Sequence, residues 1–416
     1  MLIADFDGSA VERLGVRRGI VENLALKTLF SLGEVSVQEL ATHLRVTPFI
    51  VEGVFQRHRK DELMQAVGLA QGGHRINLTA AGRSRAIELL GTDQYVGPVP
   101  VALADYVERV KSQSVREILV TEADVRDTFQ GLVLDDAVLA QLGTSVISGR
   151  AIFLHGPPGT GKTTIAERLA DLFRREAIAV PYAVEVDGQI ITVFDPNLHE
   201  SVPPAEGQGG DPRWVSCRRP RIMVGGELTI DMLDLQFNPF THFYTAPVQM
   251  RANNGVLIVD DFGRQRIPPA DLLNRWVVPL DRRVDFLTMV GGKKLQIPFD
   301  LFVVFATNLD PGTVVEEAFL RRIQTKINLS KVTPAQFHEI FRGACTAAEV
   351  DYDAALVDTL IERIEHELKQ PLRPCQPRDL INQIKWRARY EQHAPVLSAQ
   401  TLDAACCAYF IAPPEA

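Results

Sequence analysis

The stretch GPPGTGKT, residues 156–163, constrains the fold of this chain more than any other feature. It fits the pattern G-x-x-x-x-G-K-[ST], with an apolar run at 151–154 before it and a helical pattern after it. Glycines let backbone N–H groups curl around phosphate oxygens, and a helix N-terminus adds positive potential. A chance Gly/Pro turn would lack this context. The sequence therefore predicts a nucleotide phosphate site on a strand–loop–helix unit.

The residue types in this loop indicate ATP and Mg²⁺ as the bound species. Lys162 is expected to reach the β- and γ-phosphates, and the Thr163 hydroxyl is expected to ligate magnesium. The residues predicted to hold the nucleotide here are Gly156, Pro157, Pro158, Gly159, Thr160, Gly161, Lys162, Thr163 and Thr164.

A second pattern, VLIVDDFGR at residues 256–264, lies about 100 residues downstream. A continuous apolar run is typical of a buried parallel strand. Asp260 at its end is predicted to hold the magnesium, and Asp261 to polarise the attacking water. The alternative, two acids that cap a helix, fits less well because the pair follows a strand. Aspartate is one methylene shorter than glutamate, and a 1 Å misplacement can cost about 10²-fold in rate, so slow basal turnover is expected.

Polar residues further along complete a possible catalytic set. Asn308 ends the apolar run LFVVFATN and could orient the lytic water. Arg321 and Arg322 follow, and one of them could stabilise the transition state on a neighbouring subunit, an effect worth about 10³–10⁵ in rate. The alternative for this pair is a surface salt bridge. Arg378, in the first turn of a later helix, could touch the phosphates of its own subunit.

In this order, the motifs resemble those of AAA+ ATPases over roughly residues 120–416. The resemblance implies a P-loop αβα sandwich of five strands with a C-terminal helical lid. It also implies assembly into rings or spirals, commonly hexamers, with the site at the subunit boundary. Most chaperone-like members carry glutamate at the position of Asp261, whereas some branches, including DnaA-type replication initiators, carry Asp-Asp.

Two segments resemble the loops with which AAA+ proteins grip substrates in a central channel. Met223 and Val224, before Gly225, fit an aromatic-apolar-Gly loop loosely, and an ordinary turn is the alternative. The run FLTMVGGKKLQIPF (286–299) predicts a hairpin with Lys293 and Lys294 at its tip. It resembles the hairpin of the branch that includes MoxR-type chaperones, and a solvated turn is the alternative.

The first 95 residues predict helix, helix, turn, helix, hairpin and helix, which resembles a winged helix-turn-helix. Duplex DNA could bind through residues 45–78, where the run FQRHRK and Arg75 lie. However, residues 1–95 contain eleven Lys/Arg and eleven Asp/Glu, whereas a dedicated DNA-binding domain is usually basic. Protein docking or plain scaffolding is therefore the favoured interpretation.

Composition narrows the class of protein further. The net charge of −8 argues against non-specific coating of nucleic acid. No apolar run is long enough to span a bilayer. The beginning of the chain lacks the pattern of a secretory signal. Five cysteines without metal spacing fit reduced thiols in a cytoplasm.

We expect a winged helix at 1–95, a linker at 96–120, an AAA+ αβα domain at 121–332 and a helical lid at 333–416. The expected function is an ATPase that remodels an unidentified protein client as a ring or spiral of identical subunits. The alternatives are a DNA-associated ATPase in replication, transposition or transcription, and a nucleotide-gated switch with negligible turnover.

Overall fold

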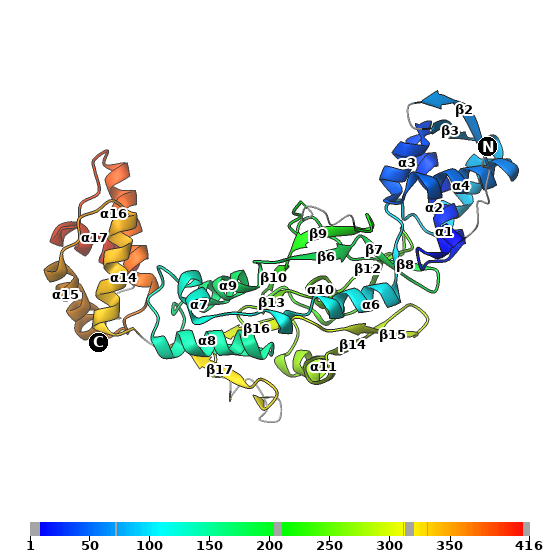
Figure 1. Ribbon diagram of the computed structural model, residues 1–416. Coiled ribbons are helices and arrows are strands. Elements are labelled where there is room, and N and C mark those ends of the chain that lie inside the picture. The colour runs from blue at the N-terminus through cyan, green and yellow to red at the C-terminus, as the bar shows by residue number, and fades with distance from the viewer. Residues whose placement is uncertain are drawn as a thin grey trace.

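The computed structural model describes residues 9–70, 73–203, 210–310, 312, 320–330 and 332–410. Its three parts follow one another along an arc, with the N-terminal unit at one end and a helical C-terminal unit at the other (Figure 1). Among the described residues, no helix combines the length and apolar character needed to cross a bilayer.

The N-terminal unit is a set of helices with a small antiparallel sheet of order β1-β3-β2. Local signals start its helices: Ser36 and Glu39 form a capping box at α3, and Pro48 opens α4. The elements are α1 (Ser9–Glu12), α2 (Arg18–Leu32), β1 (Val35–Ser36), α3 (Val37–Leu44), α4 (Pro48–Lys60), β2 (Met64–Ala70), β3 (Gly73–Leu78) and α5 (Ala80–Thr92).

The segment expected to be a linker, 96–120, contains ordered secondary structure. It forms β4 (Val101–Ala102), α6 (Leu103–Ser112) and the 3₁₀ turn η1 (Val115–Glu117). Strand β4 pairs in parallel with β7 (Ala183–Val186), and the buried Tyr106 of α6 donates to the backbone oxygen of Met250 at 3.3 Å. These residues are therefore part of the central body, because their apolar side chains have a core to join.

The central sheet has five parallel strands in the order β10-β13-β16-β5-β17. Their residues are β5 (Ile152–His155), β10 (Arg221–Val224), β13 (Val256–Val259), β16 (Phe302–Thr307) and β17 (Thr325–Asn328). Every residue of β13 and β16 is buried, because helices cover both faces. One face carries α7 (Glu122–Thr128), α8 (Asp136–Ser148) and α9 (Lys162–Phe173), and the other α10 (Val248–Arg251) and α11 (Pro269–Arg282).

A second five-stranded sheet, of order β11-β12-β8-β7-β4, was not anticipated from the sequence beyond its β7–β8 hairpin. With two further two-stranded antiparallel sheets and α6 it encloses a core of its own. The additional elements are β6 (Ala177–Pro181), β8 (Gln189–Thr192), β9 (Trp214–Arg218), η2 (Ile230–Leu233), β11 (Gln236–Phe237), β12 (Tyr244–Thr245), β14 (Val284–Thr288) and β15 (Lys294–Pro298). Ala183 and Ile190 of this sheet also join the core of the N-terminal unit.

The C-terminal unit is helical: α14 (Pro334–Ala347), α15 (Ala354–Glu362), the π-helical turn η3 (Arg363–Glu367), α16 (Cys375–Tyr390) and α17 (Ala399–Tyr409). Thr333 and Gln336 form the capping box that starts α14. The Gln336 amide also donates to Asp135 Oδ1 at 2.7 Å, which ties this unit to the start of α8.

Candidate functional site

The predicted phosphate loop joins the end of β5 to the start of α9. Gly156, Gly159 and Gly161 have φ of 148°, 80° and 85°, which side chains rarely adopt. A Cβ at Gly156 would also lie 2.2 Å from the carbonyl oxygen of Leu329. The glycines of the motif are therefore required by this backbone, quite apart from any ligand.

Lys162 is buried at the base of this loop. Its ammonium donates to the carbonyl oxygens of Gly156 and Pro157, at 2.9 and 2.8 Å. Burial lowers the pKa of Lys162, and the negative charges of Asp261 and Asp260 oppose that shift. In the folded chain, the lysine is therefore hydrogen-bonded to the loop and interacts electrostatically with both aspartates.

Thr163 and Asp260 lie in contact across the site. The Thr163 hydroxyl donates to Asp260 Oδ2 at 2.9 Å. A hydroxyl and a carboxylate are hard oxygen donors of the kind that Mg²⁺ takes alongside phosphate oxygens and water. This donor set fits the magnesium that the sequence predicts.

Asp261 is exposed beside this pair and has a φ of 46°. Aspartate tolerates the left-handed region better than most residues. The Asp261 N–H donates to Asp260 Oδ1 at 3.0 Å. The Gln265 amide donates to the Asp260 carbonyl oxygen at 2.8 Å, and its oxygen accepts from the Gly263 N–H at 2.8 Å. These bonds fix the turn after β13.

Asn308 directly follows β16 and is half-buried. Thr307 at the end of β16 is in register with His155 at the end of β5. The carboxyl ends of parallel strands share one edge, so Asn308 lies at the same edge as the phosphate loop and Asp260. The structure therefore brings this predicted residue to the site.

Arg373 and Cys375 of the C-terminal unit lie at the phosphate loop, and neither was predicted from the sequence. A Cβ at Gly159 would lie 3.3 Å from Arg373 Cδ and 2.8 Å from Cys375 Sγ. Arg373 Nε is buried without a hydrogen-bond partner among the described residues. The predicted Arg378 instead has a side chain 73% exposed and lies 3.5 Å from Asp379. The only sequence signal was a second arginine, which lies just ahead of α16.

The arginine pair lies away from the loop of its own chain. Both residues precede β17, and the start of a strand parallel to β5 is at the opposite edge of the sheet from the phosphate loop. Arg322 Nε forms an ion pair with Asp281 Oδ2 of α11 at 2.8 Å, and Arg321 is exposed. The residues at 313–319, just before the pair, lie outside the described part.

Two family models match parts of the chain. Residues 152–201 match the "ATPase family associated with various cellular activities (AAA)", and residues 333–408 match a domain of unknown function (DUF8689). The first match begins at β5 and includes the phosphate loop, and the parallel sheet around it has helices on both faces. The central part has a P-loop AAA+ fold. The helical C-terminal region follows it.

Solved structures similar to this chain include NtrX and RuvB. One is NtrX from Brucella abortus in complex with ADP, 13% identical, with a TM-score of 0.40, covering 70% of this chain and 58% of that chain. Another is the RuvB Holliday junction branch migration motor of Thermotoga maritima, 14% identical, with a TM-score of 0.39, covering 66% of this chain and 70% of that chain. The chain thus spans less than two thirds of the NtrX chain. A search of curated proteins found no match.

The prediction that Met223 and Val224 form the first channel loop is wrong, because both residues lie in a strand. Met223 and Val224 belong to β10, where Val224 is in register with Val259 and is only 4% exposed. The Val224 carbonyl oxygen also accepts from the Asp260 N–H at 2.8 Å. These residues are held in the sheet because their alternation places an apolar side chain in the core, so any loop begins after them.

The predicted hairpin is present as β14 and β15, which pair from Val284↔Pro298 to Thr288↔Lys294. Lys293 forms an ion pair with Asp187 in the β7–β8 turn. The Lys294 ammonium donates to Thr288 Oγ1 at 2.7 Å. Both lysines are therefore at the tip, as the sequence predicts, but Lys293 contacts the second sheet.

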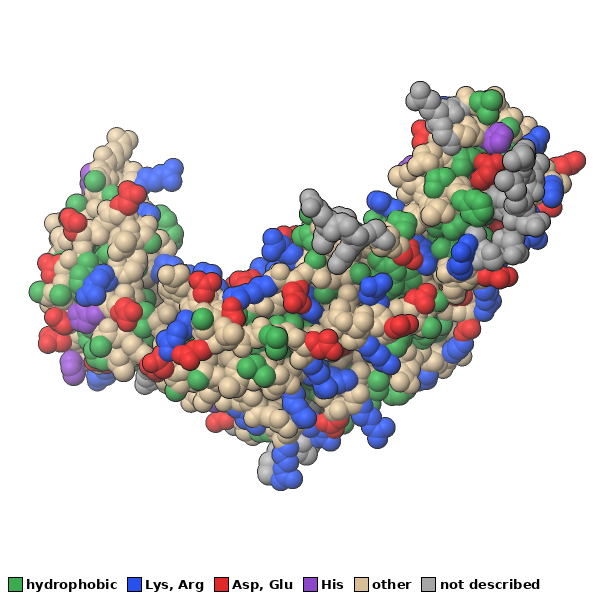
Figure 2. All heavy atoms as spheres, viewed as in Figure 1, with side chains coloured by type: hydrophobic (Ala, Val, Ile, Leu, Met, Phe, Trp, Pro, Cys, Tyr) green, Lys and Arg blue, Asp and Glu red, His purple; other side chains and the backbone are tan. Residues whose placement is uncertain are grey.

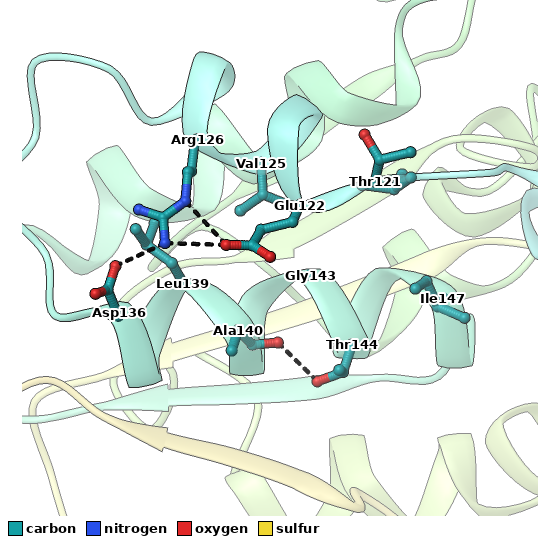
Figure 3. A pocket seen from close by; sticks show the side chains of 11 residues that line it. Thr121, Glu122, Val125, Arg126, Asp136, Leu139, Ala140, Gly143, Thr144 and Ile147 are labelled. Carbon is teal, nitrogen blue, oxygen red and sulfur yellow. Dashed lines mark hydrogen bonds and ion pairs between the residues drawn. The ribbon is translucent and has the colours of Figure 1, made fainter.

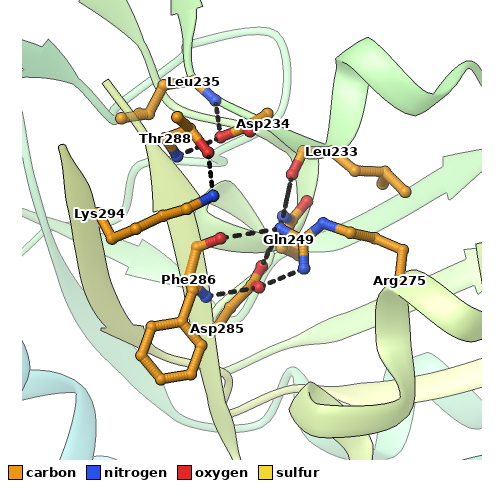
Figure 4. A network of polar contacts seen from close by, with 9 residues as sticks. All are labelled: Leu233, Asp234, Leu235, Gln249, Arg275, Asp285, Phe286, Thr288 and Lys294. Atoms are coloured by element: carbon orange, nitrogen blue, oxygen red, sulfur yellow. Dashed lines mark hydrogen bonds and ion pairs between the residues drawn. The ribbon is translucent and has the colours of Figure 1, made fainter. Parts of the chain in front are cut away.

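A buried carboxylate anchors the base of this hairpin (Figure 4). Asp285, which is fully buried, accepts from Arg275 Nη1 of α11 at 2.5 Å and from Gln249 Nε2 at 2.9 Å. Asp234 Oδ1 accepts from the Thr288 N–H at 2.7 Å. The hairpin is thereby joined to α10, α11 and the segment after η2.

A cavity of about 230 Å³ lies between α7 and α8, away from the nucleotide site (Figure 3). Its apolar lining includes Val125, Leu139 and Ile147, and ion pairs of Arg126 with Glu122 and Asp136 cross its rim. None of the predicted site residues lines it.

Proposed function

We propose that this protein is a magnesium-dependent ATPase that remodels a protein partner as a ring or spiral of identical subunits in the cytoplasm. The observation that carries the proposal is the convergence of Lys162, the Thr163–Asp260 pair and Asp261 at one edge of the sheet. A buried lysine near two aspartates is not required for the stability of a strand–loop–helix unit. Such clusters of ionisable groups with a shifted pKa occur preferentially at functional sites.

In the proposed reaction, water attacks the γ-phosphate of ATP, and ADP and phosphate leave. Thr163 and Asp260 would hold Mg²⁺, which would neutralise charge developing on the phosphates. Lys162 would bind the β- and γ-phosphates. Asp261 would polarise the water and Asn308 would orient it. Turnover is proposed to be slow without a partner, because Asp261 is shorter than the glutamate usual at this position.

Assembly would complete the site. Because Arg321 and Arg322 lie at the sheet edge opposite their own phosphate loop, they can act only on the nucleotide of another copy. Arg322 also forms an ion pair with Asp281 in its own chain, and either arginine of the pair is a candidate for the finger. Arg378 would reach the phosphates of its own subunit after the helical lid (333–416) moves relative to the AAA+ domain (121–332).

Residues 1–95 are proposed to be a winged helix that docks a protein. Two of the basic residues that suggested DNA contact are ion-paired within the unit: Arg57 with Glu22 at 3.2 Å and Arg75 with Glu34 at 2.7 Å. Exposed apolar side chains lie nearby, with Phe49 of α4 55% exposed and Leu69 of β2 82% exposed. Apolar surface of this kind favours a protein partner over duplex DNA.

The first experiment measures ATP turnover of the wild-type chain beside Lys162→Ala and Asp261→Asn. Turnover should fall to background in both variants, and Asp261→Asn should still bind ATP. If Asp261→Asn hydrolyses ATP as fast as the wild type, the role of Asp261 is refuted. A wild-type chain that binds ATP without any turnover would instead indicate the nucleotide-gated switch.

A second experiment separates the partner classes. Duplex DNA is titrated against the full chain and against Arg59→Ala/Lys60→Ala at two salt concentrations. Salt-sensitive micromolar binding that the double variant loses would establish the DNA-associated alternative. Absence of binding to both chains supports protein docking.

A further inference from the structure

A second charged site lies at the amino edge of the central sheet, opposite the phosphate loop. A cavity of about 500 Å³ there is lined by four cations and one carboxylate together with apolar residues. We call it the basic hollow; its charged residues are Lys111, Arg116, Arg282, Arg283 and Asp300. Figure 2 shows Lys and Arg side chains gathered on this face of the central body, where α6, α8 and α11 come together.

The position of the hollow separates it from the nucleotide site. Asp300 lies just before β16, and Gly149, which contacts Arg283, lies just before β5. The phosphate loop follows the other end of β5, a strand of four residues. At about 3.3 Å per residue, the two sites are separated by roughly the 13 Å length of that strand.

The cations of the hollow carry charge that the protein does not pair. Within the described ranges, none of the four forms an ion pair. The Asp300 carboxylate accepts hydrogen bonds from neutral donors: Ser114 Oγ at 2.9 Å, the Val115 N–H at 3.0 Å and Asn254 Nδ2 at 2.8 Å. In a chain with a net charge of −8, such a concentration of unpaired positive charge is unusual.

Arg283 is held as a fixed part of the wall. It ends α11 in the left-handed conformation, and its guanidinium donates to the carbonyl oxygens of Leu301, at 2.8 Å, and Gly149. Burial, and next the neighbouring charge of Arg116, lower the pKa of Arg283 to about 10. An anion in the hollow would relieve this repulsion.

We propose that the basic hollow binds a compact oligophosphate, with two or three linked phosphate groups. Three of its four cations are arginines, whose planar guanidinium groups match phosphate oxygens in pairs. Its volume lies in the range of small-ligand sites. Its lining contains no aromatic side chain on which nucleic acid bases could stack, which favours a small oligophosphate over a single strand.

The test uses inorganic tripolyphosphate and isothermal titration of the full-length chain. Arg116→Ala/Arg282→Ala removes two exposed arginines of the hollow, neither with a side-chain partner among the described residues. Lys385→Ala/Arg389→Ala, on the exposed face of α16, makes the same change in net charge as a control. Both pairs are also made in the Lys162→Ala background, in which the phosphate loop is disabled.

The expected result is a second tripolyphosphate site that survives Lys162→Ala. Its affinity should fall about 10-fold or more for each arginine removed, and the control pair should leave it unchanged. Titration with ADP shows whether the natural ligand is a nucleotide or a bare phosphate chain. In the Lys162→Ala background, tighter binding of ADP than of tripolyphosphate indicates a nucleotide, and equal binding of the two indicates a bare phosphate chain.

Three outcomes would overturn the proposal. The first is equal binding of tripolyphosphate by the arginine pair variant and the control pair in the Lys162→Ala background. The second is equal competition by a glutamate decapeptide, which would show a general acidic surface. The third is arginine-dependent binding of an oligonucleotide without binding of tripolyphosphate, which would make the hollow part of a nucleic acid surface.

Discussion

The Thr163 hydroxyl donates to Asp260 Oδ2 at 2.9 Å, across 97 residues of sequence. The bond joins the first turn of the phosphate-loop helix to the residue after β13, a strand that β16 separates from β5. It places two oxygen ligands side by side before any metal binds. Preorganised ligands of this kind reduce the ordering that metal binding requires.

We predict that Asp260→Asn abolishes magnesium-dependent turnover while the fold persists. The asparagine amide has the same shape as the carboxylate and can still accept a hydrogen bond from the Thr163 hydroxyl. It lacks the negative charge that attracts the metal. Turnover should fall by about 10³-fold, because a metal can contribute several kcal/mol to the transition state. Turnover is measured across a Mg²⁺ titration, and circular dichroism checks the fold. A variant restored to wild-type rate at high Mg²⁺ would show that Asp260 only tunes affinity.

We predict different effects of Arg373 and Arg378, which lie around the start of α16. Arg373 lies against Gly159, so Arg373→Ala should weaken ADP binding about 10-fold, with part of the affinity restored in Arg373→Lys. Arg378→Ala should leave ADP affinity within about threefold and reduce turnover, because its side chain is mainly exposed. Fluorescence titration gives the affinities. Equal losses of affinity in both variants would contradict the assignment.

We predict that the base of the β14–β15 hairpin depends on Asp285. Asp285→Asn leaves Arg275 without its buried carboxylate, at a cost of about 3 kcal/mol. Amide hydrogen exchange should accelerate in β14 and β15 more than in β13. Asp271→Asn, an exposed acid on the same helix α11, is the control and should leave the hairpin unchanged. Uniform acceleration in the whole chain would instead mean a general loss of stability.

The N-terminal unit contains a buried lysine whose contribution to stability should depend on pH. Lys27 is 1% exposed and pairs with Asp93 Oδ1 at 2.5 Å. Burial lowers the pKa of Lys27 below its ordinary value of 10.5, although Asp93 opposes the shift. Asp93→Ala should therefore destabilise the unit by about 3 kcal/mol, whereas Lys27→Met should cost less, because the side chain of Asp93 is 31% exposed and can be hydrated.

The sign of the pH dependence follows from proton binding. With Asp93 removed, the unfolded chain binds the Lys27 proton more tightly than the folded chain does. The stability of Asp93→Ala should then rise as the pH is raised toward 10.5. We measure this stability by amide hydrogen exchange in α2 at several pH values, with a correction for the intrinsic exchange rates. Stability of Asp93→Ala that is independent of pH would contradict the lowered pKa.

Much of the fold and of the candidate site follows from local sequence. The phosphate loop is contiguous, and its glycines, lysine and threonine determine their own geometry within eight residues. The runs VLIV and LFVVFAT could only be buried strands, so Asp260 and Asn308 were placed at strand ends correctly. The ordered segment at 96–120 was missed, because two residues of strand show no period until a partner strand pairs with them.

The sequence by itself determined the nucleotide-binding unit, because the motif's backbone conformation depends on residues next to one another. Only the tertiary structure decided that Val224 is a core residue and that Arg373, rather than Arg378, lies at Gly159. It alone also brought Arg116, on the segment after α6, beside Arg282 and Arg283 at the end of α11. Contacts over such separations depend on how helices and sheets pack, and no local pattern specifies that packing.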